Sequence, residues 1–453
     1  MKLAQRLPFD EIQKTLVRGS IGSLAVRSAG LAAALGAEVL LTRRLGTAGY
    51  GVYSFVLSWL AVIAVGLKLG LDAALVRCIA SYRAAENWDL LKGIISWSFR
   101  LVAGFGLAAA LALWLVTTRS GLLQDAQVKA AFAVGCLILP LIPLLALRES
   151  SLQGLKRPAL SLFSSRILLP LTLTVSIAAY YLAAGAIDSR TALYCLFIAH
   201  GAAVLFSSAV LFRSLPEAAR RAEPEFRRGE WTAVGAGMLF VSGQYLIFNR
   251  IDIIMLEPLA GKSATGIYSA AVRLAWLVSF FVQAVSVIAA PLISELHSGK
   301  RKAELHRMVH LAVSASSACS ALVFIALVIA GKFALGIFGP EFVAGYRALV
   351  ILCAAQFFNA VTGPSGFLLT MTGHEKQLAV LLSLALALNV ILNYLLIPLY
   401  GIEGAAMATG ISTIFWNALA ALLIRRRLGI IPVVGLSHLG PYPVKPETHK
   451  GGA

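Results

Sequence analysis

Apolar runs of about 20 residues recur along the whole chain and restrict its fold more than any other feature. The stretch YGVYSFVLSWLAVIAVGLKLGLDAALVRC, residues 50–78, is long enough to cross a bilayer as a helix. Hydrophobic residues make up 59% of the 453 residues and charged residues 13%, whereas soluble domains have about 25% charged residues. The sequence therefore predicts an all-α polytopic membrane protein.

Lysine and arginine are distributed unequally between the two sides of the predicted membrane. Segments on the side of the N-terminus, counted with the helix-end residues Arg18 and Arg148, hold 25 of them, and the opposite loops, counted with the helix-end residue Arg347, hold 8. Because cytoplasmic loops carry an excess of these residues, both termini are predicted to be cytoplasmic. We predict twelve membrane-spanning helices at residues 18–41, 51–76, 93–117, 130–150, 159–184, 191–212, 231–256, 266–294, 308–330, 346–371, 378–399 and 403–424.

The two halves of the chain resemble each other. YGVYS at 50–54 recurs as TGIYS at 265–269, and the glycine-centred turns LQGLKRP at 152–158 and MTGHEKQ at 371–377 are similarly placed. Six helices per half preserve orientation, which predicts two lobes related as a parallel repeat. The predicted parts are a cytosolic segment (1–17), an N-lobe (18–213), a cytosolic linker (214–230), a C-lobe (231–424) and a basic cytosolic tail (425–453).

Charged side chains interrupt several predicted helices, although one charge near the middle of a bilayer costs about 2.5–3.5 kcal/mol on insertion scales. Cations outnumber acids among them, which predicts a polar cavity that receives an anion. Arginine suits phosphate because its planar group donates two parallel hydrogen bonds. The cations are Arg27, Lys68, Arg100, Arg166, Arg250 and Arg273, and the acids are Glu38, Asp72 and Asp252.

We assign candidate roles to seven of these residues. The candidate substrate-binding cations are Arg27, Lys68, Arg273 and Arg250, and the candidate ion-coupling acids are Glu38, Asp72 and Asp252. Two of the assignments have simpler alternatives, because Lys68 can pair with Asp72 four residues on, and Arg250 can pair with Asp252. Arg100 and Arg166 lie near the cytosolic ends of their helices, where they either line the cavity or extend to the membrane surface.

Other chemistries find little support in the sequence. The GKS at 261–263 resembles the end of a phosphate loop, but position 256 is Leu where that motif needs glycine. His306 and His310 are predicted to lie on a solvated helix face, and the five cysteines are expected to be buried free thiols. We predict no enzyme activity, cofactor, metal site or nucleic-acid partner.

The stretch LTRRLGTAGYGVYSFVLSWLAVIAVGLKLGLDAALVRCIASYR resembles the polysaccharide biosynthesis flippases, the Wzx-type branch of the MATE-like (MOP) exporter superfamily. The match lies in the turn after the first helix, at Arg43 or Arg44, Leu45, Gly46, Tyr50, Gly51 and Tyr53. The later stretch ATGIYSAAVRLAWLVSFFVQAVSVIAAPLISEL is also similar to the eighth helix of that family. The resemblance covers roughly residues 15–430.

This resemblance implies a flippase that works by alternating access in the bacterial inner membrane. Its expected substrate is an undecaprenyl-pyrophosphate-linked oligosaccharide for O-antigen, capsule or exopolysaccharide. Protons or sodium ions would drive it, and a polymerase and chain-length machinery would be its protein partners. Related lipid II flippases use cavity arginines on the first, second and eighth helices, where this chain has Arg27, Lys68 and Arg273.

Three alternatives stay open at the level of sequence. A drug or cation antiporter of the same fold would favour a cavity dominated by acids. A lipid II flippase would share the cationic cavity. A membrane glycosyltransferase or polysaccharide ligase would need large outer loops, whereas the longest here have about a dozen residues.

Overall fold

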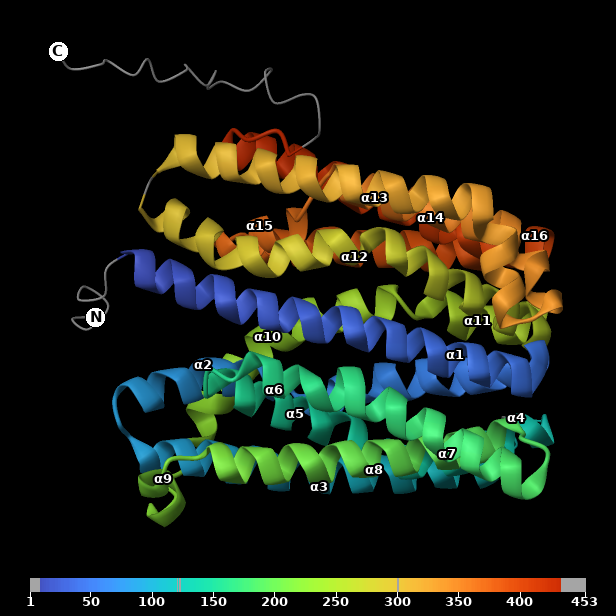
Figure 1. The fold of residues 1–453 in the computed structure, drawn as a ribbon, viewed down its shortest axis with the longest axis horizontal. Helices are drawn as coiled ribbons and strands as arrows, with labels where there is room; N and C mark the ends of the chain where they lie inside the picture. The colour runs from blue at the N-terminus through green and yellow to red at the C-terminus, as the bar shows by residue number, and fades with distance from the viewer. Residues whose placement is uncertain (1–8, 120, 122–123, 300, 433–453) are drawn as a thin grey trace. The chain divides into compact units, whose positions relative to one another are not determined.

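The computed structural model describes residues 9–119, 121, 124–299 and 301–432, and every regular element in those ranges is helical. The predicted all-α fold class is therefore confirmed (Figure 1). The elements are α1 (Phe9–Lys68), α2 (Leu71–Ala84), α3 (Trp88–Arg119), α4 (Ala126–Ile138), α5 (Leu141–Gly154), α6 (Pro158–Phe163), η1 (Ser164–Leu168), α7 (Leu169–Ala184), α8 (Ser189–Ser214), α9 (Glu217–Arg221), α10 (Arg228–Phe248), α11 (Ile251–Ala260), α12 (Lys262–Ser298), α13 (Lys302–Phe338), η2 (Pro340–Gly345), α14 (Tyr346–Val361), α15 (Ser365–Met371) and α16 (Glu375–Leu428).

The longest helix, α1, consists of two legs that fold back on each other at Gly46. Tyr50 Oη donates a hydrogen bond of 2.6 Å to Glu38 Oε2, whereas a straight helix would separate residues twelve apart by about 18 Å. Gly46 has φ 65°, a left-handed conformation that glycine adopts without steric cost. Gly401, with φ 57°, interrupts α16 in the same way.

The helices account for the predicted membrane spans. Nine helical stretches within the described residues are long and apolar enough to cross a membrane. The stretches that contain Gly46 and Gly401 supply two legs each, and α10 with α11 covers the predicted span 231–256. The chain is therefore a multi-pass membrane protein with a place for each of the twelve predicted helices.

The repeated YGVYS and TGIYS segments meet at their glycines. A Cβ atom added to Gly51 would lie 1.8 Å from the Lys262 carbonyl oxygen, and one added to Gly266 would lie 1.9 Å from the Thr47 carbonyl oxygen. Gly51 and Gly266 are 215 residues apart, and so are Thr47 and Lys262, which is the offset of the sequence repeat. Only glycine allows backbones to approach this closely, so the repeated glycines have a packing role.

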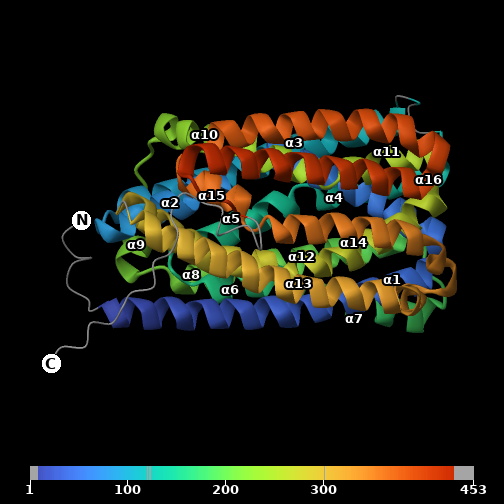
Figure 2. The same cartoon turned by 90° about the horizontal axis from the view of Figure 1, so that it is seen from above.

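Internal contacts divide the chain into two compact units. The first contains the chain up to Ala270 together with Leu335–Ala344, and the second contains Ala271–Ala334 and the chain from Gly345 onward. In the first unit α7 packs against both α1 and α8 (Figures 1 and 2). This division, which is based on contacts, groups α10 and α11 with the first half of the chain. The N-lobe and C-lobe were predicted from the sequence repeat instead, and they stay a prediction.

The predicted linker is packed against the first unit. Lys92 Nζ, on α3, donates hydrogen bonds of 2.7 and 2.8 Å to the carbonyl oxygens of Arg220 and Ala222. The Trp231 side chain is fully buried, and its Nε1 donates to Tyr82 Oη at 2.9 Å. The start of α10 is therefore fastened to α2 and α3 by specific contacts.

The second unit is held together by small and polar side chains. Ser320 Oγ donates to the Val278 carbonyl oxygen at 2.7 Å and joins α13 to α12. Thr362 Oγ1 donates to Asn417 Oδ1 at 2.9 Å, which joins the end of α14 to α16. Such bonds between helices are typical of packing within a membrane, where apolar contact with lipid competes with apolar contact between helices.

Candidate functional site

Cations from separate elements gather at one end of the first unit. The reversal at Gly46 explains part of this: Arg27 lies 19 residues before the turn and Lys68 lies 22 residues after it. At about 1.5 Å per residue, both are roughly 30 Å from the turn and therefore at similar depth. Arg166 of η1 joins them from a later helix. We refer to Arg27, Lys68 and Arg166 as the cation cluster.

Arg27 and Arg166 are brought together by a glycine and a π-turn. A Cβ atom added to Gly30 would lie 2.6 Å from the Arg166 carbonyl oxygen and 2.7 Å from Arg166 Cβ, so α1 and η1 touch through their backbones. The charges of Arg27 and Arg166 repel each other. Nε of Arg27 is buried and has no hydrogen-bond partner among the described residues. A guanidinium with a buried, unpartnered nitrogen beside a second cation is a place where an anion would be stabilised.

The widened helix η1 (Ser164–Leu168) is the local feature that sets the direction of the Arg166 side chain. Single π-turns are rare within helices and often occur at functional sites. Arg166 is exposed, and it lies between Arg27 of α1 and Glu149 of α5.

Lys68 forms the ion pair that the sequence suggested. Its Nζ lies 2.7 Å from Asp72 Oδ2, and the two side chains are 19% and 26% exposed. The other oxygen, Oδ1, accepts a hydrogen bond of 3.0 Å from the Ala73 amide. Both Asp72 oxygens are therefore engaged.

Glu149 is a member of this site that the sequence-based assignment missed. Its carboxyl lies beside Ser165, and the cations that act on it are Arg166 and Lys68. Its Oε1 is buried without a hydrogen-bond partner within the described ranges. The adjacent Arg148 stacks over the Phe99 ring, with Cζ 3.5 Å from the centroid. The sequence feature that could have identified Glu149 was the charged dipeptide Arg148–Glu149, just inside the end of the predicted helix 130–150.

The remaining candidate acids of the first unit are held by tyrosines. Glu38 accepts from Tyr50 Oη at 2.6 Å, and Asp252 accepts from Tyr268 Oη at 2.6 Å. Glu38 is 7% exposed and Asp252 is 3% exposed. Glu38 lies about 16 Å along the helix from Arg27, so the two side chains are at different depths on the first leg of α1.

The other candidate cations are placed as follows. Arg250 lies at the break between α10 and α11, directly before α11 begins at Ile251, and Asp252 lies in the first turn of α11. Arg273 is an exposed residue of α12 in the second unit. Arg100 extends toward the linker, with Cζ 6.0 Å from the centroid of the Phe226 ring. The structure thus brings Arg27, Lys68 and Arg166 together, and Arg100 joins the linker instead.

The expectation for the histidine pair was wrong. His306 is 3% exposed instead of solvated, and its ring lies 4.5 Å from that of His310. Helical spacing alone could not distinguish a buried face from a solvated one here, because charged residues surround the pair in the sequence.

The opposite end of the first unit is joined by polar contacts. Lys262 Nζ forms an ion pair with Asp125 and a 3.3 Å hydrogen bond to Gln127 Oε1. The hydrogen bond from Lys262 holds the pKa of Asp125 below its ordinary value, and the Val128 amide contributes in the same direction. Arg43 Nε donates to the Ile337 carbonyl oxygen at 2.7 Å at the same turn. These contacts tie the Gly46 turn region and α4 to the later helices.

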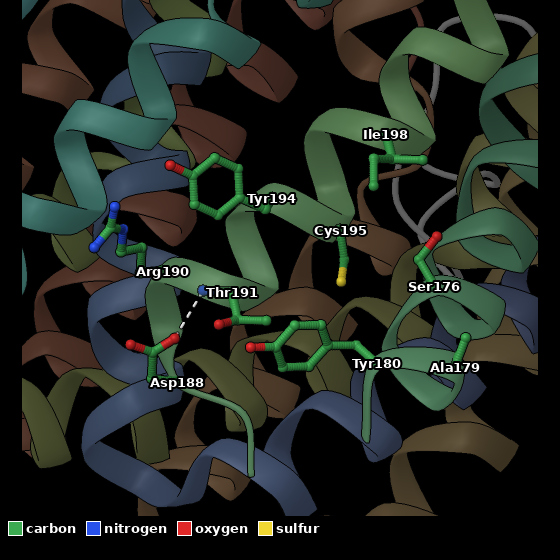
Figure 3. A pocket seen from close by; sticks show the side chains of 9 residues that line it. All are labelled: Ser176, Ala179, Tyr180, Asp188, Arg190, Thr191, Tyr194, Cys195 and Ile198. Carbon is green, nitrogen blue, oxygen red and sulfur yellow. Dashed lines mark hydrogen bonds between the residues drawn. The ribbon is translucent and has the colours of Figure 1, made fainter. Parts of the chain in front are cut away.

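A groove of about 690 Å³ lies between the end of α7 and the start of α8. Figure 3 shows Arg190 beside the Tyr194 ring, with Cζ 5.8 Å from its centroid, and Asp188 accepting a 2.8 Å hydrogen bond from the Thr191 amide. Arg166 lies just before the first residue of α7, whereas the groove lies at the other end of that helix, so the groove is distant from the cation cluster. Its lining consists of Ser176, Ala179, Tyr180, Asp188, Arg190, Thr191, Tyr194, Cys195 and Ile198.

Comparisons with known proteins agree on the family and the fold. The sequence matches a family model described as polysaccharide biosynthesis protein over residues 16–297, and a second model, MatE, over residues 238–395. The probable low-salt glycan biosynthesis flippase Agl15 of Haloferax volcanii is 26% identical over 166 residues, which are 36% of this chain and 35% of that protein. The probable flippase AglR of the same organism is 23% identical over 193 residues, or 41% and 40% of the two chains. The chain thus spans about a third to two fifths of the length of these relatives.

Solved structures share the fold at low sequence identity. An inward-facing multidrug resistance transporter of the MATE family, in the MOP superfamily, has a TM-score of 0.74 at 14% identity, covering 90% of this chain and 98% of that chain. A MOP superfamily transporter from Pyrococcus furiosus, with a binding pocket of reversed polarity that suggests a different function, has a TM-score of 0.66 at 14% identity and coverages of 92% and 95%. The predicted MATE-like fold is confirmed.

Proposed function

This chain belongs to the polysaccharide biosynthesis protein family, whose model covers more than half of it, and we propose that it is a flippase for a lipid-linked oligosaccharide. The cation cluster is the observation that carries this proposal. Its three cations, Arg27, Lys68 and Arg166, come from separate segments of the chain, and Nε of Arg27 is buried without a hydrogen-bond partner among the described residues. This arrangement suits the pyrophosphate that joins the lipid to the sugar, because each phosphate can accept two hydrogen bonds from one guanidinium.

A flippase must move a polar headgroup past hydrocarbon. Each hydroxyl that enters hydrocarbon without a hydrogen-bond partner costs several kcal/mol, so an oligosaccharide faces tens of kcal/mol without assistance. A hydrated cationic cavity that leaves the lipid chain in the bilayer lowers this barrier. We propose that Arg27, Lys68, Arg250 and Arg273 bind the headgroup during transport, and that Arg166 belongs to the same set.

The remaining parts of the proposal follow from the family. The expected substrate is an undecaprenyl-pyrophosphate-linked oligosaccharide for surface polysaccharide in a bacterial inner membrane, with both termini cytoplasmic. We propose protons or sodium as the coupling ion, with Glu38, Asp72 and Asp252 as candidate acids. A polysaccharide polymerase and its chain-length machinery would receive the product. Agl15, a probable flippase of glycan biosynthesis, supports a glycan substrate.

The charge of the cluster argues against a drug or cation antiporter, the main alternative for this fold. A cationic drug would meet the repulsion of the cation cluster, in which Arg27 and Arg166 already repel each other. The transporter from Pyrococcus furiosus with a pocket of reversed polarity shares this fold. A pocket of different polarity is thus compatible with this fold.

The proposal is tested by flipping in reconstituted liposomes. A fluorescent lipid-linked oligosaccharide is incorporated on one side, and its loss of protection from a membrane-impermeant quencher reports flipping. Arg27→Ala should reduce the rate by roughly 10²-fold, as expected when a positioned charge contact is lost. The matched control is Arg190→Ala, which removes an exposed arginine of the distant groove and should leave the rate within about twofold. Equal rates for wild type and Arg27→Ala would refute the role of the cluster.

A further inference from the structure

The linker between α8 and α10 brings two arginines to one aromatic ring beside α3. The ring is that of Phe226, and the arginines are Arg100 of α3 and Arg228, the first residue of α10. The guanidinium carbon Cζ of Arg100 lies 6.0 Å from the ring centroid, and Cζ of Arg228 lies 5.6 Å from it. Both arginines and the ring are exposed. We refer to Arg100, Phe226 and Arg228 as the arginine–phenylalanine patch.

Close contacts hold this part of the linker against α3. The Glu225 amide donates a 3.1 Å hydrogen bond to the Asp89 carbonyl oxygen, and a Cβ atom added to Gly93 would lie 1.7 Å from the Glu225 carbonyl oxygen. Only glycine allows a carbonyl group this close to a helix. The buried Trp231 ring packs on Trp97 of α3, with centroids 5.4 Å apart. The aromatic ring of the patch is therefore held by contacts that precede and follow it in the sequence.

The two arginines of the patch differ from other linker arginines because no acid pairs with them. Arg221 forms an ion pair with Glu217, and Arg227 forms one with Glu225 at 3.2 Å. The patch arginines contact the shared ring, and they make no ion pair or side-chain hydrogen bond among the described residues. Their charges are therefore available to an anion that is not part of the chain.

The patch lies at the boundary between the polar and apolar parts of α3. Residues 101–118, directly after Arg100, carry no charge and extend for about 27 Å as a helix, close to the thickness of about 30 Å of a bilayer's hydrocarbon core. Leu107 and Leu111 follow Arg100 on the same side of the helix, because they are seven and eleven residues further on. They are 64% and 58% exposed. An apolar exposed face thus continues from Arg100 into the membrane.

We propose that Arg100, Phe226 and Arg228 form a binding site for the headgroup of an anionic phospholipid in the leaflet that is predicted to be cytoplasmic. The two guanidinium groups donate hydrogen bonds to the lipid phosphate, whose oxygens match their planar geometry. The acyl chains lie along the exposed face of α3 that includes Leu107 and Leu111. This lipid is a resident of the membrane instead of the transported substrate, and the inference does not rest on the proposed function.

The apolar face beside the patch favours a lipid over a soluble anion. A soluble phosphate gains only contacts with two exposed arginines, and salt screens such contacts. A phospholipid already lies at the level of the patch, and its chains cover the apolar face that a soluble anion leaves bare. Basic side chains at the end of a membrane helix attract anionic lipids for the same reason.

Native mass spectrometry of the full-length protein in neutral detergent tests the site. The two probes are dioleoylphosphatidylglycerol, which is anionic, and dioleoylphosphatidylcholine, which has the same chains and a phosphate but no net charge. The dissociation constant of the first bound lipid is measured for each. One arginine near a membrane surface raises the affinity for an anionic lipid by roughly fivefold. Wild type should therefore prefer phosphatidylglycerol by roughly 25-fold.

Substitutions locate this preference on the chain. Arg100→Gln and Arg228→Gln should each reduce it to roughly fivefold, and the double variant should bind the two lipids about equally. Arg221→Gln is the matched control, because it removes an exposed linker arginine that already pairs with Glu217, and it should keep the wild-type preference. Glycerol phosphate, which lacks the chains, should not displace phosphatidylglycerol at an equal concentration.

Several results would overturn the proposal. Wild type that binds the two lipids equally would have no anionic lipid site. A preference that persists in the double variant and disappears in Arg27→Ala would place the lipid at the cation cluster instead. Displacement by glycerol phosphate at an equal concentration would show that the site takes a soluble phosphate. The melting temperature of each variant reports folding, and if the double variant does not fold, the two single variants decide.

Discussion

Substitution of Gly30 by alanine tests the contact that brings Arg166 to Arg27. The new Cβ would lie 2.6 Å from the Arg166 carbonyl oxygen, whereas ordinary contact begins at 3.4 Å. The two backbones must therefore separate by about 0.8 Å, the difference between these distances. The overpacking costs about 1–3 kcal/mol, and alanine returns up to about 1 kcal/mol through its higher helix propensity. The net loss of stability should therefore lie between about 0 and 3 kcal/mol.

The effect on transport should be larger than the effect on stability. A misplacement of about 1 Å at a binding site can reduce a rate by roughly 10²-fold, so we expect Gly30→Ala to slow flipping by roughly 10- to 100-fold. The control is Gly36→Ala on the same leg of α1, where the added Cβ meets no heavy atom of the described chain within 4 Å. Flipping rate and melting temperature are measured for both. A wild-type rate in Gly30→Ala would show that this contact does not position the site.

The remaining predictions concern other parts of the molecule. Trp231→Ala should lower the unfolding free energy by about 3–5 kcal/mol in a detergent unfolding assay, because it removes a fully buried ring and its bond to Tyr82; a change below about 1 kcal/mol would contradict the packing of the linker. The pKa of Asp125 beside Lys262 is lowered in the folded protein. The ionised carboxylate therefore stabilises the fold at a pH above the ordinary pKa of aspartate, and this stabilisation is lost as the pH falls through the lowered pKa. Wild type should thus lose melting temperature more steeply than Asp125→Asn in that acidic range, and parallel curves would refute the linkage. A reporter enzyme that works only in the cytoplasm should be active when it is fused after Arg427. Activity at this position of a reporter that works only outside the cytoplasm would contradict the predicted topology.

Much of the fold follows from two sequence signals. Bilayer-length apolar runs predicted the helices, and the glycine-containing repeats predicted equivalent segments, which the structure brings together at Gly51 and Gly266. The Lys68–Asp72 pair was also predictable, because residues four apart face each other on a helix. These features depend on local spacing, which a sequence displays directly.

Other features depend on contacts between distant segments. The approach of Arg166 to Arg27 requires both the π-turn at Ser164–Leu168 and the small side chain of Gly30, and no periodicity in the sequence indicates a π-turn. Glu149 lies near a helix end, where charged residues are commonly solvated, so its position among buried groups was not evident. The linker looked like a polar connection, and the burial of Trp231 against Tyr82 shows only in the folded chain.

Photo-crosslinking of the headgroup tests most directly whether the cation cluster binds substrate. A lipid-linked oligosaccharide with a photoreactive group next to its pyrophosphate is incorporated into liposomes with the wild-type protein, and the labelled peptides are identified by mass spectrometry. We predict label in the segments around Arg27, Lys68 and Arg166, with competition by unlabelled lipid-linked oligosaccharide. Label confined to the groove near Arg190 and Tyr194 would show that the headgroup binds elsewhere and would contradict the proposed site.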